Sequence, residues 1–201
     1  MTVVTVAPTR LPRWIENFTA RHGACSLRVA DGSLLGEAAD TSTFSASLPF
    51  SGSYSGPAEV GSFVAACAPP DDWGVLLVRK GGFAVARLAG ELMEESKVGQ
   101  RHVQGRTKAG GQSQQRFARR RGNQARIAFE AAADHAARIA GSVPVLVVGG
   151  DQVAVTEVLN DPRLSRIPVV GEFLTVPDPR RAVLEAAIAE ACAVTISVTN
   201  A

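Results

Sequence analysis

The sequence predicts an α+β fold with α/β character, in which a mixed β-sheet is covered by helices. Three observations lead to this prediction. Short β-rich runs dominate the chain up to about residue 100, a helical pattern extends over residues 113–140, and strand-like and helix-like segments then alternate towards the C-terminus. Strands that come first, followed by helices that alternate with strands, are typical of a sheet packed against helices.

Residues 1–72 contain short elements that we expect to pack onto the same domain as the rest of the chain. Residues 11–23 predict a helix, because their apolar side chains recur at helical spacing and a glycine follows them. Residues 25–38 predict a β-hairpin around an Asp-Gly turn. The Ser-, Gly- and Thr-rich residues 37–57 indicate an alternating edge strand and a loop, and residues 58–68 indicate a short helix.

Residues 73–201 form the second predicted domain, which begins with three strands. The run 73–90 predicts a hairpin, since two β-rich segments flank the turn sequence Arg-Lys-Gly-Gly. Residues 91–106 alternate enough to predict a further strand, which leads into a glycine-rich loop at 105–111.

A long helix over residues 113–140 is the clearest prediction in the sequence. Ser113 is a suitable N-cap and Gly141 a stop signal. Apolar residues recur at helical spacing through this region: Ala118, Ala125, Ala128, Phe129, Ala132, Ala136, Ile139 and Ala140.

Four further elements are predicted after the long helix. Residues 142–150 form a continuous apolar run of the kind found in a buried central strand, and a helix over 151–164 follows it. Residues 168–176 predict another strand. A final helix is expected over 178–194, with Asp-Pro at its start.

The positive charge of the chain is concentrated in one segment. Nine of the 21 Lys and Arg residues lie between Lys97 and Arg126, where there is no Asp or Glu, while the rest of the chain holds 12 basic residues against all 19 acids. Clustered like charges are costly unless an anionic partner meets them, so this segment indicates a phosphate-rich partner. The alternative interpretation is a basic face exposed to solvent.

Composition argues against several classes of function. No apolar run approaches the roughly 20 residues needed to span a bilayer, and the N-terminus lacks the pattern of a secretory signal, so we expect a cytoplasmic protein. Cys25, Cys67 and Cys192 are far apart, without a second cysteine or a histidine at ligand spacing. We therefore expect buried thiols, with no metal site and no cofactor.

The known enzyme motifs are also missing. Residues 145–151, VLVVGGD, lack the third glycine of a dinucleotide site and the Lys-Ser/Thr pair of a P-loop, which favours a tight strand-to-helix turn over a nucleotide site. The histidines, serines and carboxylates form no recognisable catalytic set. A self-contained acid–base enzyme is therefore not supported.

Gly110, Gly111 and Gln112 remain as the candidate for chemistry. Two consecutive glycines allow backbone conformations that are closed to other residues and a close approach to a ligand. Glutamine is neither a nucleophile nor a base at neutral pH, but its amide can donate and accept, and its backbone N–H can point at a leaving oxygen. These three residues precede an arginine-rich helix in the acid-free segment.

The stretch GGQSQQRFARRRGNQ, residues 110–124, resembles the catalytic segment of eukaryotic and archaeal class I peptide release factors, whose pattern is roughly GGQS-x-x-RFARLR. The resemblance extends over residues 73–194, which are similar to the middle domain of that family. Residues 1–72 do not resemble its codon-reading domain, and the chain is identified as similar to compact bacterial members of the VLRF (Vms-like release factor) family. The matching positions are Gly110, Gly111, Gln112, Ser113, Arg116, Phe117, Ala118, Arg119 and Arg121.

This resemblance implies a fold, an activity and partners. The expected fold is the release-factor middle domain, which is RNase H-like, with the long helix after the GGQ loop. The expected activity is codon-independent hydrolysis of peptidyl-tRNA at the peptidyl transferase centre of the large ribosomal subunit, in ribosome rescue and quality control. Gly110 and Gly111 would shape the loop, and Gln112 would place its backbone N–H near the leaving 3′ oxygen and help to orient water. The expected protein is a monomer without membrane contact, which uses ribosomal RNA and peptidyl-tRNA as partners.

We expect a set of mostly basic side chains around the GGQ motif to contact RNA phosphates and to read no sequence. They are Arg101, His102, Arg106, Lys108, Arg116, Arg119, Arg120, Arg121 and Arg126. Two other functions stay open: cleavage of the tRNA 3′ end in stalled peptidyl-tRNA, and ribosome binding without catalysis.

Overall fold

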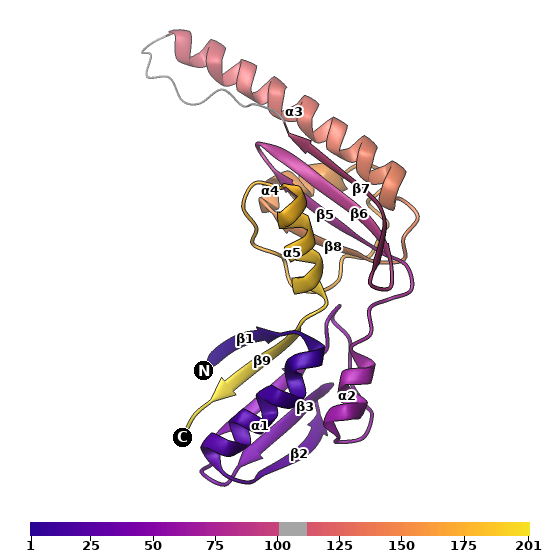
Figure 1. The fold of residues 1–201 in the computed structure, drawn as a ribbon. Coiled ribbons are helices and arrows are strands. Elements are labelled where there is room, and N and C mark those ends of the chain that lie inside the picture. The colour runs from indigo at the N-terminus through magenta and orange to yellow at the C-terminus, as the bar shows by residue number, and fades with distance from the viewer. Residues whose placement is uncertain (101–111) are drawn as a thin grey trace. The chain divides into compact units, whose positions relative to one another are not determined.

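The computed structural model describes residues 1–100 and 112–201, and of residues 112–125 it describes the backbone alone. The described part of the chain contains one antiparallel sheet, one mixed sheet and helices that pack on them (Figure 1). The predicted α+β fold class is therefore confirmed.

The chain divides into two compact units, each with its own sheet. Unit 1 comprises Met1–Pro70 and Ile188–Ala201, and unit 2 comprises Asp71–Ala187. The predicted ranges, 1–72 and 73–201, differ from this division because the C-terminal residues belong to unit 1 in the structure. Each unit has a separate cluster of buried side chains.

Unit 1 contains an antiparallel sheet of five strands, in the order β1-β9-β4-β3-β2. The C-terminal strand pairs with strands from the N-terminal part of the chain on both sides. The strands are β1 (Thr2–Val6), β2 (Cys25–Ala30), β3 (Ser33–Ala38), β4 (Thr43–Ser47) and β9 (Val194–Thr199).

One face of this sheet is covered by α1 (Leu11–His22), which the short helix η1 (Pro8–Arg10) precedes, and by α2 (Val60–Ala66). Phe44 of the sheet meets Trp14 and Phe18 of α1 edge to face, at ring-centroid distances of 5.3 and 5.1 Å. Such aromatic pairs stabilise a core beyond the area that they bury. The register places Leu34, Phe44, Ala46 and Ile196 on this same face, so strand alternation supplies the core.

The sequence predicted α1, α2 and the β2–β3 hairpin, and the structure confirms them. The edge strand predicted within residues 37–57 is wrong in its position, since β4 lies inside the sheet between β9 and β3. Strands β1 and β9 were not predicted. Because β9 follows β4 by about 150 residues and inserts between β1 and β4, no local pattern could place it.

Unit 2 contains a mixed sheet of four strands, in the order β7-β6-β5-β8. The pairs β5–β6 and β6–β7 are antiparallel and β5–β8 is parallel, as a mixed sheet requires. The predicted hairpin over residues 73–90 is confirmed as β5–β6, and the further strand predicted within residues 91–106 is confirmed as β7. The strands are β5 (Trp73–Arg79), β6 (Gly82–Ala89), β7 (Leu92–Gln100) and β8 (Leu146–Gly150).

Helices cover both faces of the unit 2 sheet (Figure 1). The long α3 (Gln112–Ala140) and α4 (Gln152–Leu159) pack on one face, together with Phe83 and Val85 of β6. Helix α5 (Arg181–Ala191) covers the other face. All three helices were predicted.

Three details of unit 2 differ from the prediction. Helix α3 begins at Gln112, one residue before the predicted start at Ser113. Residues 168–176 do not form a strand: Val169 and Leu174 make isolated bridges to β8, and Gly171 between them has a φ of +75° that interrupts extended structure. Strand β8 is buried as predicted, but it is the outer strand of the ladder, and these two bridges cover its free side.

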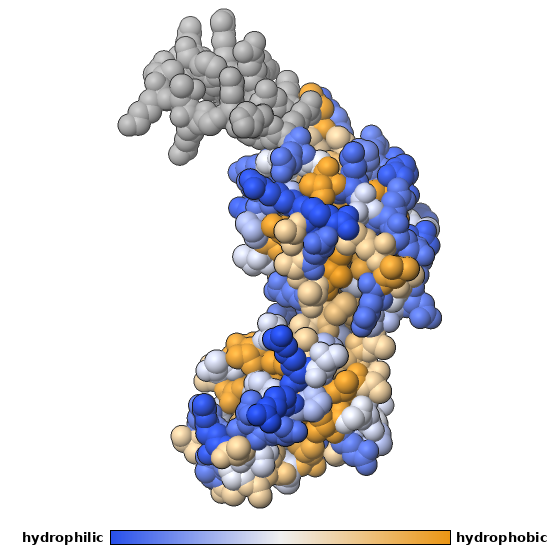
Figure 2. Space-filling model, viewed as in Figure 1, coloured by the Kyte–Doolittle hydropathy of each residue, from blue (hydrophilic) through white to orange (hydrophobic). Residues whose placement is uncertain are grey.

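Polar and apolar residues are interspersed on the visible surface of both units (Figure 2). Within the part of the chain that the structure describes, no helix combines the length and the hydropathy that a bilayer crossing needs.

Candidate functional site

The predicted catalytic residues adjoin the start of α3. Gly110 and Gly111 lie outside the described residues, and Gln112 is the first residue of the helix. Strand β7 ends at Gln100, so the GGQ motif is flanked in the chain by β7 on one side and α3 on the other. The contacts that hold β7 and α3 together therefore also hold the two flanks of the motif.

The predicted RNA-binding residues fall into three groups. Outside the described residues lie Arg101, His102, Arg106 and Lys108. On the described backbone of α3 lie Arg116, Arg119, Arg120 and Arg121. Arg126 is described in full: its exposed guanidinium forms an ion pair with Glu130, one helical turn further along.

Helix α3 is continuous from the GGQ motif to the core of unit 2. Its C-terminal half is anchored by Ala132, Ala136, Ile139 and Ala140, which are buried against the sheet. Figure 1 shows its N-terminal half extending past the end of the sheet. Because the backbone is helical throughout, Arg116, at three- and four-residue spacing from the next two arginines, shares one side of the helix with them.

A salt bridge links β7 to α3. Arg138 donates a hydrogen bond to Glu95 at 2.5 Å. A β-bulge makes this contact possible: Leu88 pairs with Met93 but Arg87 pairs with Glu95, which leaves one extra residue on β7. Without that residue the alternation of the strand would turn Glu95 to the opposite face of the sheet.

The other face of β7 is linked to α5. Ser96 accepts a hydrogen bond of 2.8 Å from Arg181, whose guanidinium also pairs with Glu185 on its own helix. Adjacent residues of β7 therefore contact helices on opposite faces of the sheet, as strand geometry requires. Together with the Glu95 contact, this fixes the strand that leads into the GGQ segment from both sides.

Phe83 packs between the end of β7 and α3. Its ring stacks on His135 of α3 at a centroid distance of 5.4 Å. On the strand side, a Cβ atom at Gly99 would lie only 2.2 Å from Cε1 of Phe83, and a Cβ at Gly82 would lie 2.4 Å from the carbonyl oxygen of Gly99. Glycine at position 99 therefore lets β7 pass close to the ring of Phe83, and glycine at position 82 lets the backbones of β6 and β7 approach each other.

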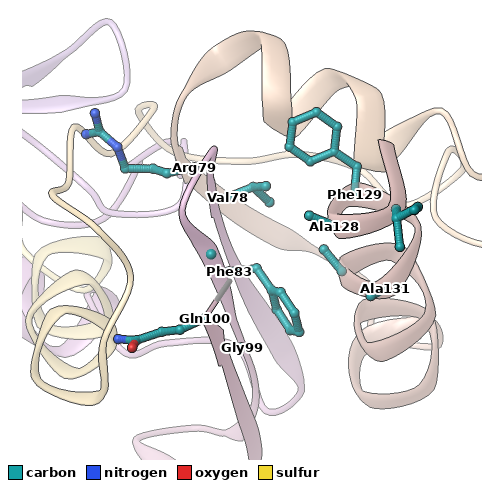
Figure 3. Close-up of a pocket in the computed structure, with 11 residues that line it drawn as sticks. Val78, Arg79, Phe83, Gly99, Gln100, Ala128, Phe129 and Ala131 are labelled. Carbon is teal, nitrogen blue, oxygen red and sulfur yellow. The ribbon is translucent and has the colours of Figure 1, made fainter. Parts of the chain in front are cut away.

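A cavity of about 280 Å³ lies beside this contact, between the sheet and α3 (Figure 3). Its walls are mostly apolar and include Val78, Phe83, Ile127 and Phe129. Gln100, at its rim, turns its side chain away from α3 in Figure 3. The cavity thus presents few groups that could perform chemistry.

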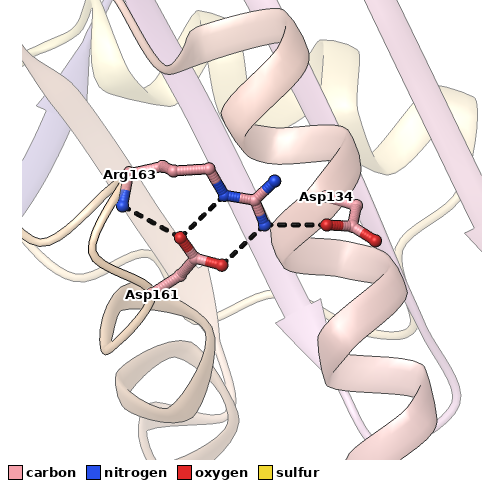
Figure 4. A network of polar contacts seen from close by, with 3 residues as sticks. All are labelled: Asp134, Asp161 and Arg163. Atoms are coloured by element: carbon pink, nitrogen blue, oxygen red, sulfur yellow. Dashed lines mark hydrogen bonds and ion pairs between the residues drawn. The ribbon is translucent and has the colours of Figure 1, made fainter.

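A polar network attaches the segment after α4 to α3 (Figure 4). Arg163 donates to both Asp161 and Asp134, each at 2.7 Å, and Asp134 belongs to α3. Hydrogen bonds from the Arg163 side chain and backbone hold the pKa of the Asp161 carboxyl at about 2, below its usual range. The carboxylates of Asp161 and Asp134 in turn raise the pKa of Arg163, so the pair of Asp161 and Arg163 stays charged at neutral pH.

The glycine turn after β8 leads directly into Asp151, which caps the N-terminus of α4. Gly150 has a φ of +112°, and its backbone packs against the carbonyl of Val78. Asp151 accepts a hydrogen bond from the N–H of Ala154 at 3.1 Å and so occupies the N-terminus of α4 with a carboxylate. This agrees with the predicted strand-to-helix turn, because an anion there would meet the negative charge of Asp151.

The three cysteines of the described residues are thiols that differ in burial. Cys67 is buried, and its burial raises the pKa of the thiol to about 11. Cys25 and Cys192 are half-buried, so the expectation of buried thiols holds fully for one of the three. Across residues 1–100 and 112–201, no three His, Cys, Asp or Glu side chains gather as metal ligands would.

The supporting residues of the motif could not be found in the sequence. Glu95 and Arg138 are 43 residues apart, and no spacing rule connects them. The same holds for Phe83 and His135. Their contacts depend on the packing of α3 across β6 and β7.

Comparison with known proteins assigns the chain. The family described as "acVLRF1: Actinobacteria/chloroflexi VLRF1 release factor" matches residues 71–197. The chain belongs to this acVLRF1 family. The match covers the whole of unit 2, the GGQ motif and most of strand β9.

Other comparisons add little to the acVLRF1 assignment. Pelota from Archaeoglobus fulgidus is similar in structure, with 11% sequence identity over 92% of this chain and a TM-score of 0.30. This chain spans 60% of the length of that protein, and so low a TM-score supports no further inference. No curated protein matches the chain.

Proposed function

We propose that this acVLRF1 protein frees nascent chains from stalled ribosomes by hydrolysing peptidyl-tRNA at the peptidyl transferase centre, without reading a codon. The observation that carries the proposal is the GGQ motif at the start of α3, within a segment of nine basic and no acidic residues. Its membership of a release factor family supports the same role. The proposed place of action is the cytoplasm.

The proposed reaction is the hydrolysis of an ester. Water attacks the carbonyl carbon that joins the peptide to the terminal ribose, the bond from this carbon to the 3′ oxygen breaks, and the 3′ oxygen takes up a proton. The products are a peptide carboxylate and a tRNA with a free 3′ hydroxyl. In this proposal the backbone N–H of Gln112 donates to the 3′ oxygen as its charge develops, and the side chain orients the water.

The arginines of α3 have a separate role in this proposal. They neutralise RNA phosphates and position the motif, while ribosomal RNA forms most of the surroundings of the reacting ester. The described residues fit this division. Glu95 and Arg138 join β7 to α3, and Phe83 and His135 join β6 to α3, so these side chains have structural contacts and do not form a catalytic acid–base pair. Glycines at 110 and 111 leave the backbone free to approach the ester.

The test is the release of peptide from stalled ribosome complexes whose mRNA offers no stop codon. Gln112→Pro removes the backbone N–H at the first position of α3, where a helix tolerates proline, and Gln112→Ala removes the side chain alone. We expect Gln112→Pro to lower the release rate by about 10²–10³-fold, the usual effect of removing one such donor. Gln115→Ala, in the same helix, is the matched control.

The same reactions decide between this function and its alternatives. Equal release by wild type, Gln112→Ala and Gln112→Pro would overturn the role of Gln112. A liberated tRNA with an intact CCA end supports ester hydrolysis, whereas a shortened end identifies a nuclease. Binding to the ribosome without any release identifies a binding factor.

A further inference from the structure

Strand β1 forms one edge of the unit 1 sheet. Only β9 pairs with it, in an antiparallel register from Thr2↔Val198 to Val6↔Val194. In the described part of the chain, no backbone hydrogen bond reaches residues 2–6 from any other segment. The outward N–H and C=O groups of β1 are thus free to pair with another strand.

Among the residues that the structure describes, the other three sheet edges carry protection against such pairing. Strand β2 carries the exposed Arg28. Strand β7 carries Glu94, Glu95 and Lys97 and a β-bulge. The free side of β8 is covered by the bridges from residues 169 and 174. Charges, bulges and covering segments are the usual devices by which proteins prevent edge-to-edge association.

Strand β1 has none of these devices. Its sequence is TVVTV, which contains only β-branched, uncharged residues and no proline. Its pairing with β9 is regular through all five residues, so there is no bulge. Val3 is 54% exposed on the face of the sheet opposite α1. Such a strand combines high β-propensity with an open edge.

We propose that a second copy of this chain pairs with this edge, β1 to β1 in antiparallel orientation about Val4. In this register Val4 lies opposite Val4, Thr2 opposite Val6, and Val3 opposite Thr5. Each pair joins positions on the same face of the sheet, because Thr2, Val4 and Val6 face the core and the other two face away from it.

Self-pairing suits this strand better than pairing with a charged partner. No like charges meet across the proposed interface, since residues 2–6 hold no charge. The apolar side of the pair continues the core of each copy through Val4 and Val6, which pack on the unit 1 cluster. A two-fold axis through Val4 relates the two copies. Their five-stranded sheets join into one continuous sheet, and no third copy can pair at this edge.

The dimer differs from the monomer that the sequence predicted. Strand pairing over five residues buries far less than the roughly 1,600 Å² of a standard stable interface, so the dimer dissociates on dilution. We expect the sedimentation coefficient of the full chain to rise with protein concentration. A wild-type protein that sediments as a monomer at every concentration would overturn the proposal.

Two charge variants test the edge and its register together. Val3→Lys/Thr5→Lys places lysines opposite one another on both sides of the Val4 pair and is expected to abolish the dimer. Val3→Lys/Thr5→Glu has charges at the same two positions but places Lys opposite Glu, and it is expected to retain the dimer. Circular dichroism and thermal unfolding establish that both variants fold. Dimerisation of both variants, or of neither, contradicts the proposed pairing.

Disulfide trapping provides an independent measurement. Directly opposed Cα atoms in an antiparallel pair are about 4.5–5.5 Å apart, which a disulfide can span. Val4→Cys is therefore expected to form a covalent dimer on mild oxidation, and Val3→Cys, which lies opposite Thr5, is expected not to. The wild type, with its three native cysteines, provides the background. Equal cross-linking of the two variants excludes the register about Val4.

Discussion

Glu95 of β7 accepts a hydrogen bond from Arg138 of α3, and this contact joins the two elements that flank the GGQ motif. The bulge between the pairs Arg87↔Glu95 and Leu88↔Met93 turns Glu95 to the α3 side. In an unbroken strand the same carboxylate would face α5. One inserted residue therefore decides which helix the strand is tied to.

We expect Glu95 and Arg138 to couple weakly in stability. Their side chains are 47% and 57% exposed, and exposed pairs of this kind contribute about 0.2–1 kcal/mol. A double-mutant cycle with Glu95→Ala and Arg138→Ala, followed by urea unfolding, measures the coupling free energy. The charge-swapped protein Glu95→Arg/Arg138→Glu should regain part of the stability that either single substitution removes. A coupling of zero would mean that packing alone holds β7 against α3.

Gly99→Ala should destabilise unit 2. The new methyl group would lie 2.2 Å from the ring of Phe83, which is itself stacked on His135, so the ring cannot move without disturbing α3. Overpacking of this kind costs about 1–3 kcal/mol, measured as a shift in the urea unfolding midpoint.

The matched control is Gly61→Ala. Gly61 lies in α2, and a Cβ atom there would meet nothing within 4 Å. Alanine is favoured over glycine inside a helix, so this variant should gain about 0.5–1 kcal/mol. A Gly99→Ala protein as stable as the wild type would contradict the inference that Phe83 packs too closely against β7 to admit a methyl group.

The stability of unit 2 should depend on the ionisation of Asp161. The folded protein holds the pKa of this carboxyl at about 2, below the ordinary value of 3.8. Because the folded pKa is the lower one, the stabilisation is complete above pH 3.8 and is lost as the pH falls to about 2. The difference in unfolding free energy between wild type and Asp161→Asn should therefore shrink over this interval. A difference that stays constant with pH would contradict the role of the Arg163 contact.

Binding to the ribosome should be sensitive to salt through the arginines of α3. Affinity falls as the salt concentration rises, so the slope of log affinity against log salt is negative. Replacing Arg119 and Arg120 with glutamine should make this slope less steep, by about 0.7–0.9 for each phosphate that the variant no longer neutralises. Arg10 and Arg13, two exposed residues of unit 1, provide the matched control as Arg10→Gln/Arg13→Gln, which removes the same number of charges. The same change of slope in both proteins would show that net charge, and not the α3 segment, governs binding.

Much of unit 2 could be predicted because its elements carry local signals. The hairpin 73–90 has β-rich runs around a glycine turn, and α3 has apolar residues at helical spacing over almost its whole length. Residues 168–176 carried a strand-like pattern too, but Gly171 takes a left-handed conformation and only two bridges form. Hydropathy alone does not report this backbone conformation.

The sequence by itself determined the α+β class, most of the helices and hairpins, and the GGQ motif with its acid-free surroundings, because these depend on residues close together in the chain. Only the tertiary structure decided that β9 lies between β1 and β4, and that Glu95 meets Arg138. Both contacts join segments far apart in sequence. Their free energy comes from burial and pairing between elements, which no local window contains.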